Sequence, residues 1–204
     1  MIVASVATVG WYRRHDPPGR GALATAGAAA LLIAAAAALL LAMGRVPTYR
    51  HGPFRLYTSD VHGDENSQQL TDPYTFTHVT HGILLYAALH VVGGRAPIGL
   101  RVVTAVALEG LWEVVENTDA VIARYRAETI AQGYYGDSVV NSIGDMAATI
   151  VGFAIAASLP ARATAALAVV LESVLLLWIR DNLALNVVML LWPIDALRVW
   201  QQGG

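Results

Sequence analysis

The chain has 204 residues, of which 56% are hydrophobic and only 14% are charged, and its formal net charge is -2. Soluble globular chains average about 45–50% apolar and about 25% charged residues, so this composition excludes an ordinary soluble domain and favours a membrane protein. The lack of cysteine excludes disulfides and thiolate metal sites, and the slightly negative charge gives no indication of nucleic-acid binding.

The N-terminal segment, residues 1–21, begins with a short apolar run that precedes its arginines. A secretory signal peptide has the opposite order, so we expect a cytoplasmic or interfacial segment here rather than a cleaved signal. An uncharged tract rich in alanine and leucine follows at residues 22–43. Because about 20 apolar residues in a helix cross the hydrocarbon core, this tract is predicted to be the first transmembrane helix.

The rest of the chain alternates polar and apolar stretches. Residues 44–73 contain charged residues, glycines and prolines, and are predicted to form an extracytoplasmic loop. Further apolar stretches lie at residues 74–92, 98–116, 139–159, 162–178 and 183–200. Pro193 and Asp195 interrupt the last of these, which would make it kinked or re-entrant. The sequence therefore predicts an all-α integral membrane bundle of about six transmembrane helices, with a single domain at residues 22–204.

The arginines predict the orientation of this bundle. In a six-span topology, seven arginines lie on the side of the N-terminus and six on the other side. Basic residues in short loops favour the cytoplasmic side, so we predict a cytoplasmic N-terminus. The abundance of alanine and the lack of lysine are typical of a GC-rich bacterial genome, and the predicted location is the bacterial inner membrane.

Polar side chains gather at one end of four predicted spans, and an alternating topology places all four ends on the extracytoplasmic side. A charge at the centre of a span costs about 2.5–3.5 kcal/mol on insertion scales, so such residues persist where they face a cavity, a partner or an ion. At about 100° per residue, the acids of each span share one helix face. The pattern predicts a shared polar pocket formed by His78, His81, Glu113, Glu116, Asn117, Asp137, Asn141, Asp145, Arg180, Asp181 and Asn182.

Structural roles would account for several of these residues singly. Asp137 or Ser138 is suited to cap the helix that follows, asparagines join helices by hydrogen bonds, and a loop Arg–Asp pair contributes little. Glu109, Glu113 and Asp145 are the exceptions, because they lie one turn or more inside their spans.

Small residues at spacing four also mark the span at residues 139–159. They form one stripe that allows another helix to approach closely and would hold the neighbouring acidic stripe in place. The residues are Gly144, Ala148, Gly152 and Ala156.

Six segments in a fixed order carry a family resemblance: ENSQ (65–68), YTFTHVTHG (74–82), WEVVEN (112–117), RYR (124–126), YYGDSVVNSIGD (134–145) and RDNLALN (180–186). Together they resemble a family of bacterial multi-pass membrane proteins of unknown function. Pro73 stands where that family is expected to have an aromatic residue. The resemblance implies a fold and no reaction. The Asp-x-x-x-Asn-x-x-x-Asp spacing at 137–145 is similar, more loosely, to VanZ-like membrane proteins.

The first function compatible with this pattern is a membrane-embedded hydrolase that acts on a lipid or peptide. His78 and His81 would hold a divalent metal such as zinc, with one or two carboxylates from Glu113, Glu116, Asp137 and Asp145. A remaining carboxylate would be the general base, and Asn117 or Asn141 would polarise a carbonyl or phosphoryl oxygen. The HxxH spacing matches no established zinc signature. A metal-free variant uses Asp137 and Asp145 as an acid–base pair.

Two other functions stay open. One is a transporter or binder of a small solute or a lipid headgroup, since intramembrane acids and histidines form proton relays. Asn117, Arg180, Asp181 and Asn182 are predicted to bind the ligand. The other is an accessory membrane protein whose polar residues only hold the bundle together. Membrane lipid is the expected partner, nucleic acid is not, and the sequence leaves the oligomeric state open.

Overall fold

A computed structural model describes residues 20–203, and most of the predicted N-terminal segment lies outside them. The described part is helical, with one isolated backbone bridge between Tyr57 and Thr71, which confirms the predicted all-α class. The helices are α2 (Arg20–Ala42), α3 (Thr75–Gly93), α4 (Ile98–Glu116), α5 (Asp119–Glu128), α6 (Val139–Ser158), α7 (Ala161–Ile179), α8 (Leu183–Leu191) and α9 (Asp195–Gln201).

Four described helices are long and apolar enough to cross a membrane: Gly21–Ala42 within α2, and α3, α6 and α7. The prediction of six such helices was wrong by two. Helix α4 has the predicted bounds and 19 residues, but Arg101 and three glutamates reduce its apolar character. The last predicted span breaks at Pro193 into α8 and α9. The nine residues of α8 extend over only about 14 Å, half of a hydrocarbon core of about 30 Å.

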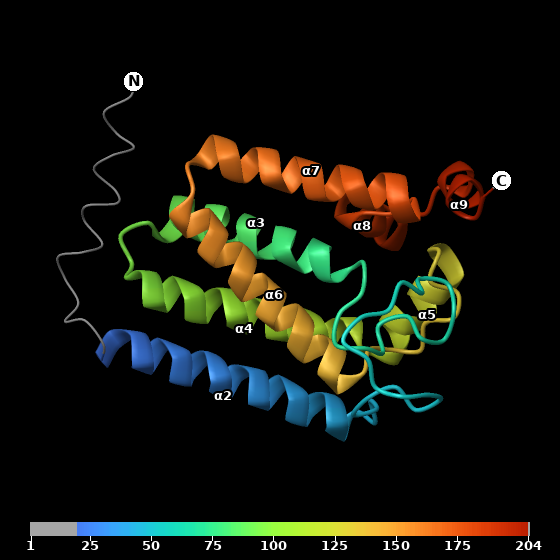
Figure 1. Ribbon diagram of the computed structural model, residues 1–204, viewed down its shortest axis with the longest axis horizontal. Helices are drawn as coiled ribbons and strands as arrows, with labels where there is room; N and C mark the ends of the chain where they lie inside the picture. The colour runs from blue at the N-terminus through green and yellow to red at the C-terminus, as the bar shows by residue number, and fades with distance from the viewer. Residues whose placement is uncertain (1–19, 204) are drawn as a thin grey trace.

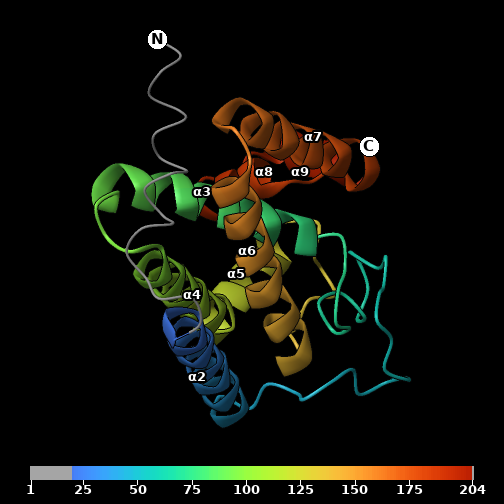
Figure 2. The same cartoon turned by 60° about the vertical axis from the view of Figure 1, so that its left-hand side comes forward.

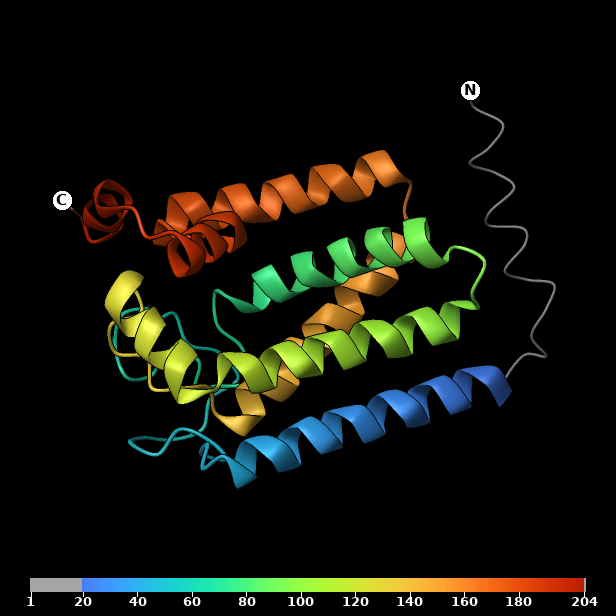
Figure 3. The ribbon, with the colours of Figure 1, turned by 180° about the vertical axis from the view of Figure 1, so that it is seen from behind.

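Helices α2, α4, α3 and α7 follow one another across the molecule, as the opposite views in Figures 1 and 3 agree. Helix α6 crosses this row and contacts all four of its members, with its most extensive contact on α3. Figure 2 shows α6 running from the neighbourhood of α2 toward α7. The outer faces of α2 and α7 expose large apolar side chains such as Leu31 and Leu177, as expected of surfaces that face lipid.

The contact between α3 and α6 depends on small residues. A Cβ atom added at Gly152 of α6 would collide with the Val79 carbonyl oxygen of α3, and one added at Gly82 would collide with the Thr149 carbonyl oxygen. The Thr149 hydroxyl also donates to the His78 carbonyl (3.1 Å). Within the predicted small-residue stripe, Gly152 thus allows the close approach of α3, whereas Gly144 lies against the Leu70 carbonyl of the connection before α3.

All the polar helix ends lie at one end of the bundle, together with α5 and the connection between α2 and α3 (Figure 1). This connection folds back onto the start of α6. The Val139 N–H donates to the Val46 carbonyl (2.8 Å), and the Ser138 N–H donates to the Ser67 carbonyl (2.9 Å). These bonds satisfy N–H groups that a helix start leaves without partners.

Candidate functional site

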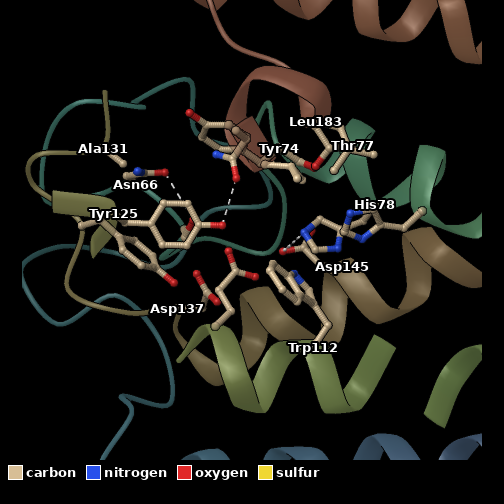
Figure 4. Close-up of a pocket in the computed structure, with 16 residues that line it drawn as sticks. Asn66, Tyr74, Thr77, His78, Trp112, Tyr125, Ala131, Asp137, Asp145 and Leu183 are labelled. Atoms are coloured by element: carbon tan, nitrogen blue, oxygen red, sulfur yellow. Dashed lines mark hydrogen bonds and ion pairs between the residues drawn. The ribbon is translucent and has the colours of Figure 1, made fainter. Parts of the chain in front are cut away.

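A cavity of about 170 Å³ lies between the polar ends of α3, α4, α6 and α8. Five of the predicted site residues line it: His78, His81, Glu116, Asp137 and Asp145. Figure 4 shows His78 and Asp145 together at one side of the cavity, with Asp137 and Tyr125 toward the other. The expected convergence of residues from separate helices is therefore present.

Glu109 joins the two histidines. Its Oε1 atom lies 2.5 Å from Nδ1 of His78 and 3.1 Å from Nδ1 of His81. Glu109 is only 2% exposed, and the two imidazole rings meet edge to face with centroids 4.9 Å apart. An ionised carboxylate can only accept hydrogen bonds, so both rings donate to Glu109 from Nδ1.

Two further acids flank His78. Glu113 is 1% exposed, and its Oε1 atom lies 3.7 Å from Nδ1 of His78. Asp145 Oδ2 lies 3.8 Å from Nε2 of the same ring. Both oxygens of Glu113 and Oδ1 of Asp145 lack a hydrogen-bond partner among residues 20–203. Since a buried carboxylate without partners is costly, these oxygens need a proton or a cation.

Two sets of side chains could hold a metal ion. One consists of His78, His81 and Glu109, the other of His78, Glu113 and Glu116, and in each set the ligand atoms lie within 4.8 Å of one another. Imidazole nitrogen and carboxylate oxygen suit zinc and similar divalent ions. The donor types and the unpartnered oxygens of Glu113 therefore fit a divalent metal.

Asp137 is held in the cavity wall by Asn117. The Asn117 amide donates to Asp137 Oδ2 (2.6 Å), and the Asp137 N–H donates to Asn117 Oδ1 (2.7 Å). Burial raises the pKa of Asp137 to about 6, although the bond from Asn117 opposes this shift. The cap of α6 is Ser138, whose hydroxyl accepts from the Asn141 N–H (3.2 Å), so Asp137 remains available to the cavity.

Asn117 and Asn141 are buried behind the cavity lining rather than in it. The Asn141 amide donates to the Gln69 carbonyl (2.9 Å) and so attaches the connection after α2 to α6. Its Oδ1 atom has no partner within the described part of the chain.

The predicted binding residues of the segment 180–182 lie outside the cavity. Asp181 is fully buried and accepts from the Tyr74 hydroxyl (3.0 Å) and the Gln201 amide (3.1 Å). Burial raises the pKa of Asp181 to about 6, although the hydrogen bond from Tyr74 lowers it. Asn182 caps α8 by accepting from the Leu185 N–H (2.9 Å). Asp181 and Asn182 thus hold α8 and α9 in place.

Arg180 is exposed, has a left-handed backbone (φ 55°), and donates to the Trp200 carbonyl (2.9 Å). Glu172 accepts from the Leu183 N–H (2.8 Å) at the start of α8. A carboxylate at a helix N-terminus is favoured by unpaired N–H groups and by the helix dipole.

The aromatic part of the lining was missed from the sequence. Tyr74, Trp112, Tyr125 and Tyr134 all line the cavity. Burial raises the pKa of the Tyr125 and Tyr134 hydroxyls well above their ordinary value, so both remain proton donors. The sequence feature that could have identified them is their position inside the six segments that carry the family resemblance.

Comparison with known proteins identifies a family and no activity. A family model described as "Protein of unknown function (DUF2585)" matches residues 40–203. A UPF0314 protein of Paracoccus denitrificans is 47% identical over 161 residues, which cover 79% of this chain and 83% of that protein. One from Brucella anthropi is 45% identical over 160 residues, covering 78% and 81%. One from Novosphingobium aromaticivorans is 47% identical over 169 residues, covering 80% and 85%.

No solved structure matches the chain. The relatives confirm the predicted resemblance to a bacterial family of unknown function. The looser similarity to VanZ-like proteins stays a prediction.

Proposed function

We propose that this chain, which belongs to the DUF2585 family of unknown function, is a membrane-embedded, metal-dependent hydrolase with its active site at the extracytoplasmic end of the bundle. The observation that carries the proposal is the pair of histidines, His78 buried and His81 partly buried, that share Glu109 and face a cavity lined with carboxylates. Such a site needs a membrane position, a metal ion, and a group that accepts the proton of water.

The membrane position is supported by how α4 lies in the bundle. It buries Glu109 and Glu113 and exposes Leu108 and Leu111. A helix that turns its charges inward and its leucines outward is suited to lipid. We therefore treat α4 as a fifth crossing helix, with α8 and α9 packed at the membrane surface.

The metal would be held by His78, His81 and Glu109, or by His78, Glu113 and Glu116. A zinc ion held there would supply an activated water, with a pKa of about 7, and would polarise a carbonyl or phosphoryl oxygen. Asp137 lines the same cavity, and its pKa of about 6 makes it a proton acceptor near neutral pH. Asn117 holds the Asp137 carboxylate in position.

The direct test is elemental analysis of the protein purified in mild detergent without chelators. We expect about one divalent metal ion per chain in the parent protein and a loss of metal in His78→Ala and His81→Ala. His90→Ala is the matched control, because His90 lies at the other end of α3 and contacts Arg101 rather than an acid. A parent protein without metal, both as purified and after titration with zinc, overturns the proposal.

Activity is tested separately with Asp137→Asn. This variant should keep its metal and lose hydrolysis of ester and phosphoester lipids. Hydrolysis at the parental rate in Asp137→Asn would show that another group accepts the proton.

A proton-coupled transporter is the second candidate. It is favoured by the unpartnered carboxylates of Glu113 and Asp145 on either side of His78, which could relay a proton along the bundle. Proton-dependent uptake into vesicles without hydrolysis would favour this function over the first.

A further inference from the structure

A second cavity, of about 220 Å³, shares Asp137 with the histidine cavity. Its other walls come from the segment that follows α2 and from the turn that precedes α6. Its lining residues are Gly44, Arg45, Val46, Arg50, Tyr135 and Gly136. The cavity thus contains two arginines and lies directly beside the proposed active site.

The guanidinium of Arg45 is held in this cavity from one side. Nη1 donates to the Tyr135 carbonyl (3.1 Å), and Nη2 donates to the Met43 carbonyl (3.4 Å) and lies 3.2 Å from Oδ1 of Asp119. The Asp119 side chain is 95% exposed, so this ion pair is screened by water and contributes little. The Nε atom of Arg45 is buried and has no partner among the described residues. The charge of Arg45 is therefore neutralised only weakly, by one exposed carboxylate.

Gly136 makes room for this guanidinium. Its φ of 98° suits glycine, and an added Cβ atom would lie 2.6 Å from Nη1 of Arg45. The Gly136 carbonyl accepts from the Gln68 amide (2.7 Å), which holds the turn against the connection after α2. The turn before α6 thus places Asp137 in the histidine cavity and leaves space for the Arg45 guanidinium in the second cavity.

Arg50 supplies a second charge. Its side chain is exposed, and its guanidinium carbon lies 6.0 Å from the centroid of the Tyr135 ring. Its guanidinium forms no salt bridge with the acids of residues 20–203. The Tyr135 hydroxyl is buried without a partner among the same residues. Two guanidinium groups are donors of the kind that bind phosphate oxygens.

The depth of the cavity indicates where the phosphate would come from. The spanning part of α2 ends at Ala42, three residues before Arg45, and the exposed leucines of α2 end there as well. The cavity therefore lies where hydrocarbon gives way to lipid headgroups, the level at which arginine side chains reach phosphates.

We propose that Arg45 and Arg50 bind the phosphate group of a membrane phospholipid and place the adjoining part of the lipid beside Asp137, in the histidine cavity. Binding of the phosphate follows from the arginine cavity alone. The role of the lipid as a substrate rests on the proposed function.

Calorimetric titration of the full-length protein in mild detergent tests the binding with three probes: dihexanoyl phosphatidic acid, sodium phosphate and neutral dihexanoyl glycerol. We expect phosphatidic acid to bind and its affinity to fall about tenfold or more in Arg50→Gln and in Arg45→Gln. Arg50→Gln is the more informative variant, because its exposed side chain has no structural bond to lose. Arg55→Gln is the matched control, because Arg55 pairs with Glu65 in the same connection and lies outside the cavity.

The probes distinguish the sources of the phosphate. A much higher affinity for phosphatidic acid than for sodium phosphate supports a lipid ligand. Equal affinities for the two probes would show that the site binds free phosphate and not a lipid. Equal binding of dihexanoyl glycerol, or unchanged affinity in Arg50→Gln and Arg45→Gln, overturns the arginine site. Metal content measured on the same samples separates the two proposals. If the protein contains no metal but its binding depends on the arginines, only the proposed hydrolase is refuted. If the protein contains metal but its binding does not depend on the arginines, only the phosphate site is refuted.

Discussion

At the scale of single residues, the site is organised by Glu109. One buried oxygen accepts from Nδ1 of both histidines and so holds the two rings edge to face. A carboxylate that orients metal-binding histidines raises their basicity and fixes their tautomer. Glu113 differs, because its oxygens lack hydrogen-bond partners among the described residues and are available to a proton or a cation.

Substitution of Glu109 tests this organisation. Glu109→Gln removes the negative charge and should weaken metal binding by about 10–100-fold, the usual effect of losing an orienting carboxylate. Competition with a chelator of known affinity measures the change. Glu128→Gln, on the surface of α5, is the control and should bind metal as the parent does. Equal affinities for Glu109→Gln and the parent would exclude Glu109 both as a ligand and as an orienting group.

The buried aspartates predict how stability depends on pH. The pKa of Asp137 in the folded protein is about 6, above its ordinary value of 3.8, so the folded state binds this proton more tightly than the unfolded chain does. Protonated Asp137 therefore contributes up to about 3 kcal/mol to the free energy of unfolding. This contribution is fully present below about pH 4 and is lost as the pH rises through 6. Thermal unfolding in detergent should therefore show a Tm that falls between pH 4 and pH 7.

Asp137→Asn should reduce this fall, because the amide stays neutral. Asp64→Asn should leave it unchanged, since the bond from His51 lowers the pKa of Asp64 and keeps it ionised over this range. A fall in Tm as steep in Asp137→Asn as in the parent would contradict the assignment.

At the scale of helices, the contact between α3 and α6 positions the site. His78 and Asp145 lie on these two helices, and glycines allow the backbones to approach within reach of each other's carbonyl groups. The short helices α8 and α9 are held by a different device, the buried Asp181 with its hydrogen bonds from Tyr74 and Gln201.

Added bulk at the α3–α6 contact should separate the helices. Gly152→Ala places a Cβ atom against the Val79 carbonyl oxygen, and overpacking of this kind costs about 1–3 kcal/mol. Gly27→Ala is the matched control in α2, where the added methyl group would meet nothing within 4 Å. That variant should be neutral or more stable, because alanine favours a helix by about 1 kcal/mol over glycine. Unfolding in graded denaturant measures both, and equal stability of the two variants would contradict the role of Gly152.

At the scale of the whole molecule, the number of crossings decides on which side the C-terminal residues lie. Five crossing helices place the end of α9 on the side of the connection after α2, whereas six would return it to the side of the N-terminus. The chain has no cysteine, so single introduced cysteines report their side without background labelling.

We expect a membrane-impermeant maleimide to label Thr48→Cys and Gln202→Cys in intact spheroplasts, and to label Arg95→Cys only after the membrane is permeabilised. All three positions are exposed. If Thr48→Cys is labelled in intact spheroplasts but Gln202→Cys only after permeabilisation, the chain crosses the membrane six times.

Local patterns determined most of the helices. The lengths of the apolar stretches predicted α2, α3, α4, α6 and α7 to within two residues at each end, because the hydrophobic length of a span is a property of consecutive residues. The stretch at 183–200 was misjudged, where Pro193 ends α8 instead of bending a longer helix, and α5 was not predicted.

The grouping of the site residues needed the tertiary structure. Helical periodicity states which side chains share a face, but not which helix that face meets. Asp137 and Asp181 both lie at the polar end of the bundle, yet the first lines the cavity and the second faces Tyr74 and Gln201. The sequence by itself thus determined the all-α class, the long apolar helices and the polar end. The packing of α3 against α6 and α4 decided which acids reach the histidines, because those contacts join residues about 30 to 70 positions apart, which no local pattern specifies.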